Sequence, residues 1–170
     1  MRTIELNIFE FSELSEESKA NAIEKLSDIN VDYDWWDCTY EDAKMIAIDI
    51  KGFDIGRGSY CEIEVDDCQD SAKLIIVNHG ECCNSFKSAK DFLETSAKLT
   101  NLLDEDEDNE YKIEAIEELL ESLEDVFKKE LSEYYLNDLR VDYDYRLSDE
   151  AVIEAIENNN YEFLENGEMR

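Results

Sequence analysis

The feature that most constrains the fold is a long apolar stripe in the C-terminal half of the chain. Within residues 109–136, large apolar side chains recur at spacings of three and four residues: Ile116, Leu119, Leu120, Leu123, Val126, Phe127, Leu131 and Tyr134. This spacing places them along one side of an α-helix. The sequence therefore predicts one long helix over 109–136 that packs its apolar side against the rest of the chain.

Shorter patterns predict the other elements. Alternation of apolar and polar residues predicts strands at 3–11, 141–146 and 161–164, and a hairpin of 53–55 with 59–65 around Gly56-Arg57-Gly58. Helices are expected after the N-caps Ser15, Asp70, Ser85 and Ser148, and over 34–51 with Gly52 at the end. The predicted class is α+β, with a small, mostly antiparallel sheet packed by several helices. A length of 170 residues suits one domain over 1–170, with a division near 104–109 as the alternative.

The net charge limits the choice of partner. The chain has 46 acidic residues against 16 Lys and Arg, for a net charge of −30, and residues 101–170 hold 24 of the acids but 6 of the basic residues. Such a field repels nucleic acids and anionic membranes and attracts basic protein surfaces. We therefore expect a basic protein partner, such as a nucleic-acid-binding host protein, and no direct binding to nucleic acid or membrane. Because no signal peptide or membrane-spanning run is recognisable, a cytoplasmic location is expected.

Five consecutive acids at 104–108 invite comparison with a calcium-binding loop. Asp104, Asp106 and Asp108 match the first, third and fifth positions of the EF-hand template. However, Asn109 stands where the template needs Gly, and Ala115 stands where it needs the bidentate Glu. The sequence therefore predicts an acidic loop and no dedicated calcium site.

Metal binding and catalysis find little support elsewhere. His79, Cys82 and Cys83 are close together, but adjacent cysteines suit one tetrahedral zinc ion poorly, and no Cys-x-x-Cys pair is present. We expect reduced thiols and a surface histidine. A hydrolase site would have to use His79, the only histidine. The sequence thus predicts a protein that is not an enzyme and has neither a metal ion nor another cofactor.

Acidic arrays provide the candidate binding residues. In the predicted strand, Asp142 and Asp144 project from one face about 6–7 Å apart. On the long helix an anionic stripe has neighbours about 5–6 Å apart, formed by Glu114, Glu117, Glu118, Glu121, Glu124 and Asp125. These spacings are close to those of phosphates along a nucleic-acid strand. A solvated helix face would explain each stripe singly, but it would carry more interspersed lysines. The predicted partner-binding residues are Asp104, Asp106, Asp108, Glu117, Glu121, Glu124, Asp142 and Asp144.

Several short segments carry a resemblance to a known group. They are 3–6, 11–17, 33–36, 52–55, 57–61, 147–150 and 161–163. With these segments the chain resembles acidic proteins of phages and prophages of Gram-positive bacteria and their relatives, some of which carry an antitoxin-like label. The resemblance implies a mobile-element setting but transfers no catalytic or binding residue.

Together, charge and resemblance lead to one functional hypothesis. We expect a phage or mobile-element protein that mimics nucleic acid and inhibits a basic host defence nuclease, of the anti-CRISPR or anti-restriction type. The alternatives are an antitoxin that neutralises a cognate basic toxin, and a non-enzymatic phage regulatory protein. In the first two cases the acidic surface would meet a basic one, in the cytoplasm of the host cell.

Overall fold

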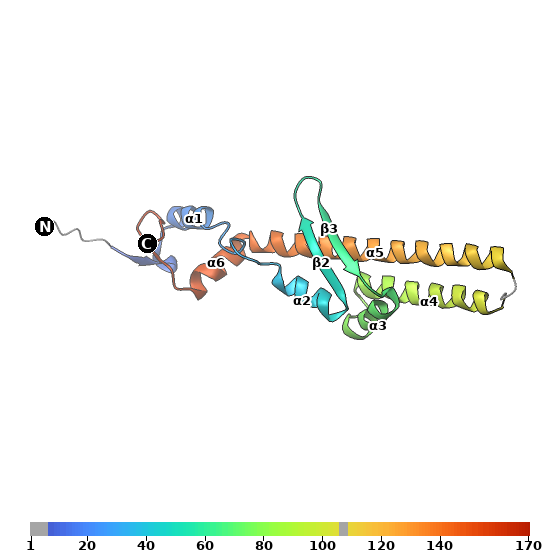
Figure 1. Cartoon of the computed structure of the whole chain (residues 1–170). Helices are drawn as coiled ribbons and strands as arrows, with labels where there is room; N and C mark the ends of the chain where they lie inside the picture. Colours follow the sequence, from blue (N-terminus) through green and yellow to red (C-terminus); the bar gives the residue numbers. More distant parts are fainter. Residues whose placement is uncertain (1–6, 106–108) are drawn as a thin grey trace. The chain divides into compact units, whose positions relative to one another are not determined.

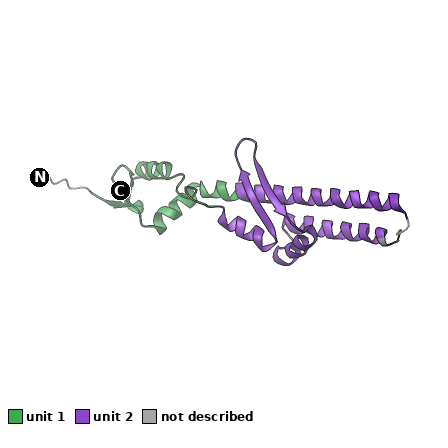
Figure 2. Cartoon of the chain, viewed as in Figure 1, with its two compact units in different colours: residues 1–35, 141–170 green, residues 36–140 purple. Residues whose placement is uncertain are grey.

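The computed structural model describes residues 7–105 and 109–170 and confirms the α+β class. Figure 1 shows the order of the elements, and Figure 2 shows two compact units, residues 1–35 with 141–170 and residues 36–140. The boundaries of the units lie at 35/36 and 140/141, away from the division considered near 104–109. One helix, α5 (Glu110–Arg146), contributes residues to both units.

The larger unit is built on two antiparallel helices. Helix α4 (Asn84–Glu105) lies against α5 through the stacked rings of Phe92 and Phe127. The other elements of this unit are α2 (Asp37–Met45), strands β2 (Ile48–Asp54) and β3 (Tyr60–Val65), and α3 (Cys68–Asn78). The Ser132 hydroxyl donates to the carbonyl of Cys61, which ties β3 to α5, and Gln69 donates to Ser96, which ties α3 to α4.

The smaller unit closes around its own apolar cluster. It contains β1 (Phe9–Glu10), the 3₁₀ turn η1 (Phe11–Glu13), α1 (Glu16–Lys25), α6 (Asp149–Asn158) and β4 (Glu162–Phe163). Strands β1 and β4 pair antiparallel. The buried cluster beneath them consists of Phe11, Leu14, Ala22, Val152, Ile156 and Phe163. The N-caps Ser15 and Ser148 and the strand at 161–164 are confirmed here.

The predicted helix over 34–51 is wrong at its C-terminal end. Helix α2 stops at Met45, Ala47 takes a positive φ of 58°, and β2 then starts at Ile48. The spacing of Ala43, Ala47 and Ile50 fits a helix, but the alternation from Ile48 to Ile50 fits a strand equally well, and pairing with β3 decides between them. Gly52 therefore lies inside β2, at a register shift, and does not end a helix.

The predicted strand at 141–146 is also wrong, because these residues are the last turns of α5. Asp142 and Arg146 form an ion pair of 2.9 Å at helical i,i+4 spacing. The Tyr143 ring packs on Trp35 at 5.4 Å. Helical contacts thus replace the strand pairing that the alternation predicted.

Smaller corrections concern the ends of elements. The N-cap of α3 is Asp67, three residues before the predicted Asp70, and Ser85 lies inside α4. The first strand is limited to β1 within the described residues, and the hairpin is confirmed with a longer β2. The long helix is confirmed and continues ten residues beyond Leu136, to Arg146.

Candidate acidic binding face

One flank of α5 carries a row of exposed carboxylates, which we call the acidic face. Its members are Glu114, Glu117, Glu118, Glu121, Glu124 and Asp125. All are exposed except Glu124, which is partly covered and pairs with Lys128 at 3.8 Å. The other five make no hydrogen bond or ion pair with any described residue. Their charges are therefore available to a partner.

The structure divides the predicted binding residues into separate groups. Glu117, Glu121 and Glu124 lie together on the acidic face, as predicted. Asp104 is in the last turn of α4, and Asp106 and Asp108 lie outside the described residues. Asp142 and Asp144 belong to the smaller unit and do not share a strand face. Of these two, Asp144 is exposed, whereas Asp142 is engaged with Arg146.

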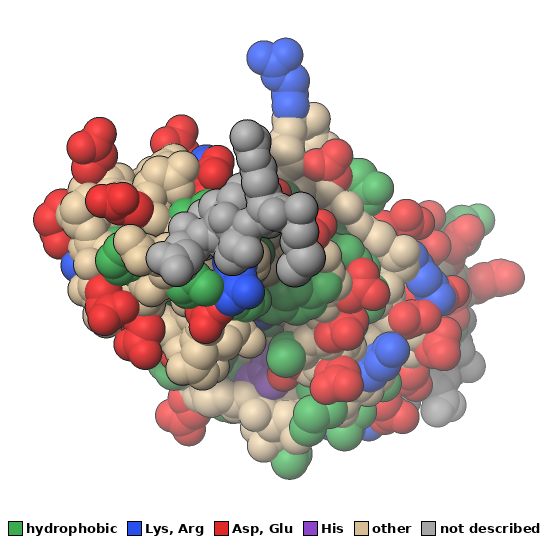
Figure 3. Space-filling model, turned by 90° about the vertical axis from the view of Figure 1, so that its left-hand side faces the viewer, with side chains coloured by type: hydrophobic (Ala, Val, Ile, Leu, Met, Phe, Trp, Pro, Cys, Tyr) green, Lys and Arg blue, Asp and Glu red, His purple; other side chains and the backbone are tan. Residues whose placement is uncertain are grey.

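The two tryptophans in the acidic segment 32–42 have structural contacts. Trp35 is buried, and the Arg146 guanidinium lies 5.9 Å from the centre of its ring. Trp36 packs edge-on against Phe53 in the larger unit. Asp32, Asp34, Asp37 and Glu41 are exposed, but the indole rings do not form a binding platform. Figure 3 shows carboxylates spread over the visible face with few Lys and Arg side chains among them.

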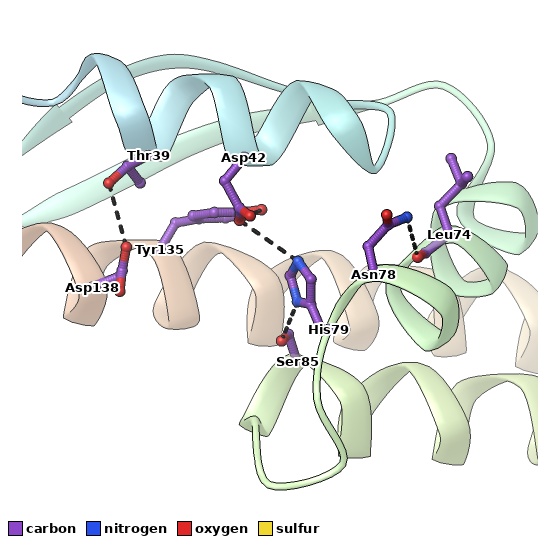
Figure 4. A network of polar contacts seen from close by, with 8 residues as sticks. All are labelled: Thr39, Asp42, Leu74, Asn78, His79, Ser85, Tyr135 and Asp138. Atoms are coloured by element: carbon purple, nitrogen blue, oxygen red, sulfur yellow. Dashed lines mark hydrogen bonds and ion pairs between the residues drawn. The ribbon is translucent and has the colours of Figure 1, made fainter.

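His79 occupies a buried polar network, against the expectation of a surface histidine. Its side chain is 6% exposed, and its Nδ1 lies 2.7 Å from the hydroxyl of Ser85 (Figure 4). Nε2 faces Asp42 at 3.6 Å, which is too long for a hydrogen bond but short enough for an ion pair with a protonated ring. Tyr135 donates its hydroxyl to the same Asp42 carboxylate at 3.3 Å.

This network joins four segments of the larger unit. Asp42 comes from α2, His79 from the end of α3, Ser85 from α4 and Tyr135 from α5. Burial, followed by the nearby Asp42 carboxylate, raises the pKa of Tyr135, so its hydroxyl stays protonated and donates. Ser85 is buried, so its hydroxyl cannot reach a substrate in this conformation. The arrangement positions helices and does not form an open hydrolase site.

The cysteines and the histidine do not converge on a metal. Among the described residues, no group of three or more His, Cys, Asp or Glu side chains has the geometry to hold an ion. All five cysteines are free thiols, and burial raises the pKa of Cys61 and Cys68 to about 11. At neutral pH these two thiols are protonated and poor nucleophiles.

A groove lies between α3 and α4. It has a volume of about 780 Å³ and an apolar floor of Ile76, Phe86 and Leu93. Its polar side chains are exposed rim residues, among them Lys87 and Lys90, so no buried polar group is aimed at a ligand. Such a groove lacks the few fixed polar groups by which small-molecule sites orient a ligand.

Comparison with known proteins gives no further information about the fold or the function of this chain. Neither the protein-family models, nor the curated proteins, nor the solved structures give a match to this chain. Within the described residues, no helix has both the length and the apolar character required to cross a membrane.

Proposed function

We propose that this protein is a non-enzymatic binding protein that sets the acidic face of α5 against a basic, nucleic-acid-binding surface of another protein. The observation that carries the proposal is the set of exposed carboxylates without described counter-ions: Glu114, Glu117, Glu118, Glu121 and Asp125. Each adjacent pair at i,i+3 or i,i+4 is separated by about 5–6 Å. A rigid helix thus presents negative charges at nearly the interval of backbone phosphates.

The electrostatics favour a basic partner over other ligands. A net charge of −30 repels nucleic acid and attracts cationic surfaces over the screening distance of about 8–10 Å at moderate salt. On contact, the carboxylates and the partner's Lys and Arg release the counter-ions that each had held, as DNA does on binding protein. The acidic face would therefore compete with nucleic acid for the same surface.

The resemblance to phage and prophage proteins suggests which partner to seek. In that setting a basic host defence nuclease, such as a CRISPR effector or a restriction enzyme, is the proposed target. The protein would act in the cytoplasm of the host cell and would need neither a cofactor nor catalysis. Asp104, Asp106, Asp108, Asp142 and Asp144 are proposed as supporting contacts, with Glu117, Glu121 and Glu124 at the centre.

A pull-down from host cells, followed by titration with the captured protein, tests the proposal. We expect a nucleic-acid-binding protein whose complex weakens as salt rises and dissociates when duplex DNA is added. An eluate without any nucleic-acid-binding protein, or a complex indifferent to salt and DNA, would contradict mimicry. Capture of a basic toxin encoded beside this chain would instead support the antitoxin alternative.

Charge reversal locates the contact. Glu117→Lys with Glu121→Lys should weaken the complex by at least about 100-fold, because two attractive charges become repulsive within the interface. Glu154→Lys with Glu157→Lys changes the net charge equally at exposed positions of α6 and is the matched control. Equal losses in both variants would mean that net charge, and not the acidic face, drives binding.

A further inference from the structure

The side of the α4/α5 pair that faces away from β3 and α3 has an unusual composition. Ser132 contacts β3, and Val126, six residues earlier, points about 120° away from it. On α4, Leu93 lines the groove beside α3, and Leu102, nine residues later, points to the opposite side of the helix. Val126 and Leu102 therefore belong to one outward side of the helix pair.

Apolar side chains are exposed along this side. Leu102, Leu119 and Val126 are 48%, 54% and 51% exposed, and Leu99, Ile116 and Leu123 beside them are half-buried. Extending the set by helical spacing gives the outer stripe, which consists of Thr95, Lys98, Leu99, Leu102, Lys112, Ala115, Ile116, Leu119, Ser122, Leu123 and Val126. A contiguous exposed apolar surface of this kind marks an interaction site.

Acidic residues avoid the outer stripe. Between Glu110 and Val126, α5 carries seven acids, at positions 110, 114, 117, 118, 121, 124 and 125, and none of them lies on the stripe. Acids return at the positions next to the ends of the stripe, which are Asp91 and Glu105 of α4 and Glu130 of α5. In a chain with 46 acids among 170 residues, an outward helix surface without any acid is not an ordinary solvated surface.

We propose that the outer stripe docks a second copy of this chain. A basic partner would be met by carboxylates, as on the acidic face, whereas a strongly acidic partner requires a surface from which acids are excluded. With a net charge of −30, a second copy is itself such a partner. When two copies join at their outer stripes, the two helix pairs stack as a four-helix bundle. The apolar side chains then become buried between the pairs.

The charges at the ends of the stripe select an antiparallel arrangement. Lys112 and Glu130 are separated by 18 residues, which is five helical turns and about 27 Å, so they project from the same side of α5. A two-fold axis across the helix pair near Ser122 brings Lys112 of each copy beside Glu130 of the other. A symmetric dimer makes this contact twice.

Sedimentation of the full chain at low and high salt tests the dimer. We expect dimerisation to strengthen as salt screens the repulsion between copies, opposite to the salt dependence of a basic partner's complex. Leu119→Glu with Val126→Glu should raise the dissociation constant at least about tenfold. Met45→Glu with Val77→Glu adds the same charge at exposed positions of α2 and α3, off the stripe, and should leave the dimer intact. A wild-type monomer at both salts, or equal behaviour of the two variants, would overturn the proposal.

A charge exchange tests the antiparallel arrangement directly. Lys112→Glu and Glu130→Lys should each weaken the dimer severalfold by placing like charges together, and the two changes combined should restore it. Loss of dimer without restoration would overturn the two-fold arrangement. Because neither residue belongs to the acidic face, partner binding through that face should be unchanged in all three variants, which separates this proposal from the proposed function.

Discussion

The ring of Phe92 in α4 stacks on the ring of Phe127 in α5, with centroids 4.5 Å apart and planes 16° apart. Both side chains are buried. This contact fixes the rotation of each helix about its own axis, and so decides which residues of α5 point outward. The acidic face and the outer stripe both depend on it.

Phe127→Ala should destabilise the protein by about 3–5 kcal/mol, because it removes a buried aromatic ring and leaves a cavity between the helices. Urea unfolding followed by circular dichroism measures the effect. Val77→Ala, at an exposed position of α3 outside the outer stripe, should change stability by less than about 1 kcal/mol. Similar losses in the two variants would show that α4 and α5 are not joined through this ring pair.

Gly167 should tolerate no side chain. It has a φ of +80°, and a Cβ there would lie 2.1 Å from the carbonyl oxygen of Ser18 in α1. We expect Gly167→Ala to cost at least about 2 kcal/mol through backbone strain and collision. Gly58→Ala is the control, since Gly58 has a φ of +92° but open space around it, and should cost about 1 kcal/mol. Thermal unfolding of both variants separates the effect of the collision from that of backbone strain. Equal losses of stability would contradict the close approach of Gly167 to Ser18.

Ser85→Ala should destabilise the larger unit by about 1–3 kcal/mol, because it leaves Nδ1 of the buried His79 without its partner. Ser88→Ala, in the same helix and only half-buried, should be nearly neutral. The free energy of unfolding in urea is to be measured for both serine variants. A neutral Ser85→Ala would mean that water reaches the imidazole and the network is not closed.

Stability should fall in alkaline solution. Burial raises the pKa of Tyr135 above its usual value near 10, and raises the pKa of Cys61 and Cys68 to about 11. Each group holds its proton more tightly when folded, so its contribution is complete below the unfolded pKa and is lost as pH rises through the folded pKa. Urea midpoints should therefore be constant near neutrality and decrease above about pH 9.

Tyr135→Phe supplies the control for this pH dependence. Without the phenol, the decline in unfolding free energy above pH 10 should be shallower by up to about 1.4 kcal/mol per pH unit. Tyrosinate absorbance should also show one fewer group that ionises only on unfolding. A wild-type midpoint that stays constant from pH 8 to 11 would contradict the burial of these groups.

Local signals in the sequence determined much of the fold. The apolar stripe of α5, the N-caps Ser15 and Ser148, the hairpin and the final strand each follow from spacing and capping preferences that act within a few residues. The acidic face was predictable for the same reason, since a regular helix fixes which residues are neighbours.

The errors arose where one segment satisfied two periodicities. Residues 47–51 fit a helix or a strand until β3 supplies hydrogen bonds to β2, and 141–146 fit a strand until Trp35 and Arg146 stabilise the helix. Distant partners decide these cases, because the free energies of the local alternatives are close. Asp142 and Asp144 do not share a strand face for the same reason, because both lie in α5.

Burial of His79 and exposure of the outer stripe were decided by tertiary structure alone. The segments that surround His79 come from four elements, and no local pattern brings Asp42, Ser85 and Tyr135 to one imidazole. Likewise, the sequence determined that Leu119 and Val126 are apolar positions of a helix, with acids on another flank. Only the packing of α4, α3 and β3 decided which apolar residues of that helix are covered, since one helix has more apolar surface than its neighbours can bury.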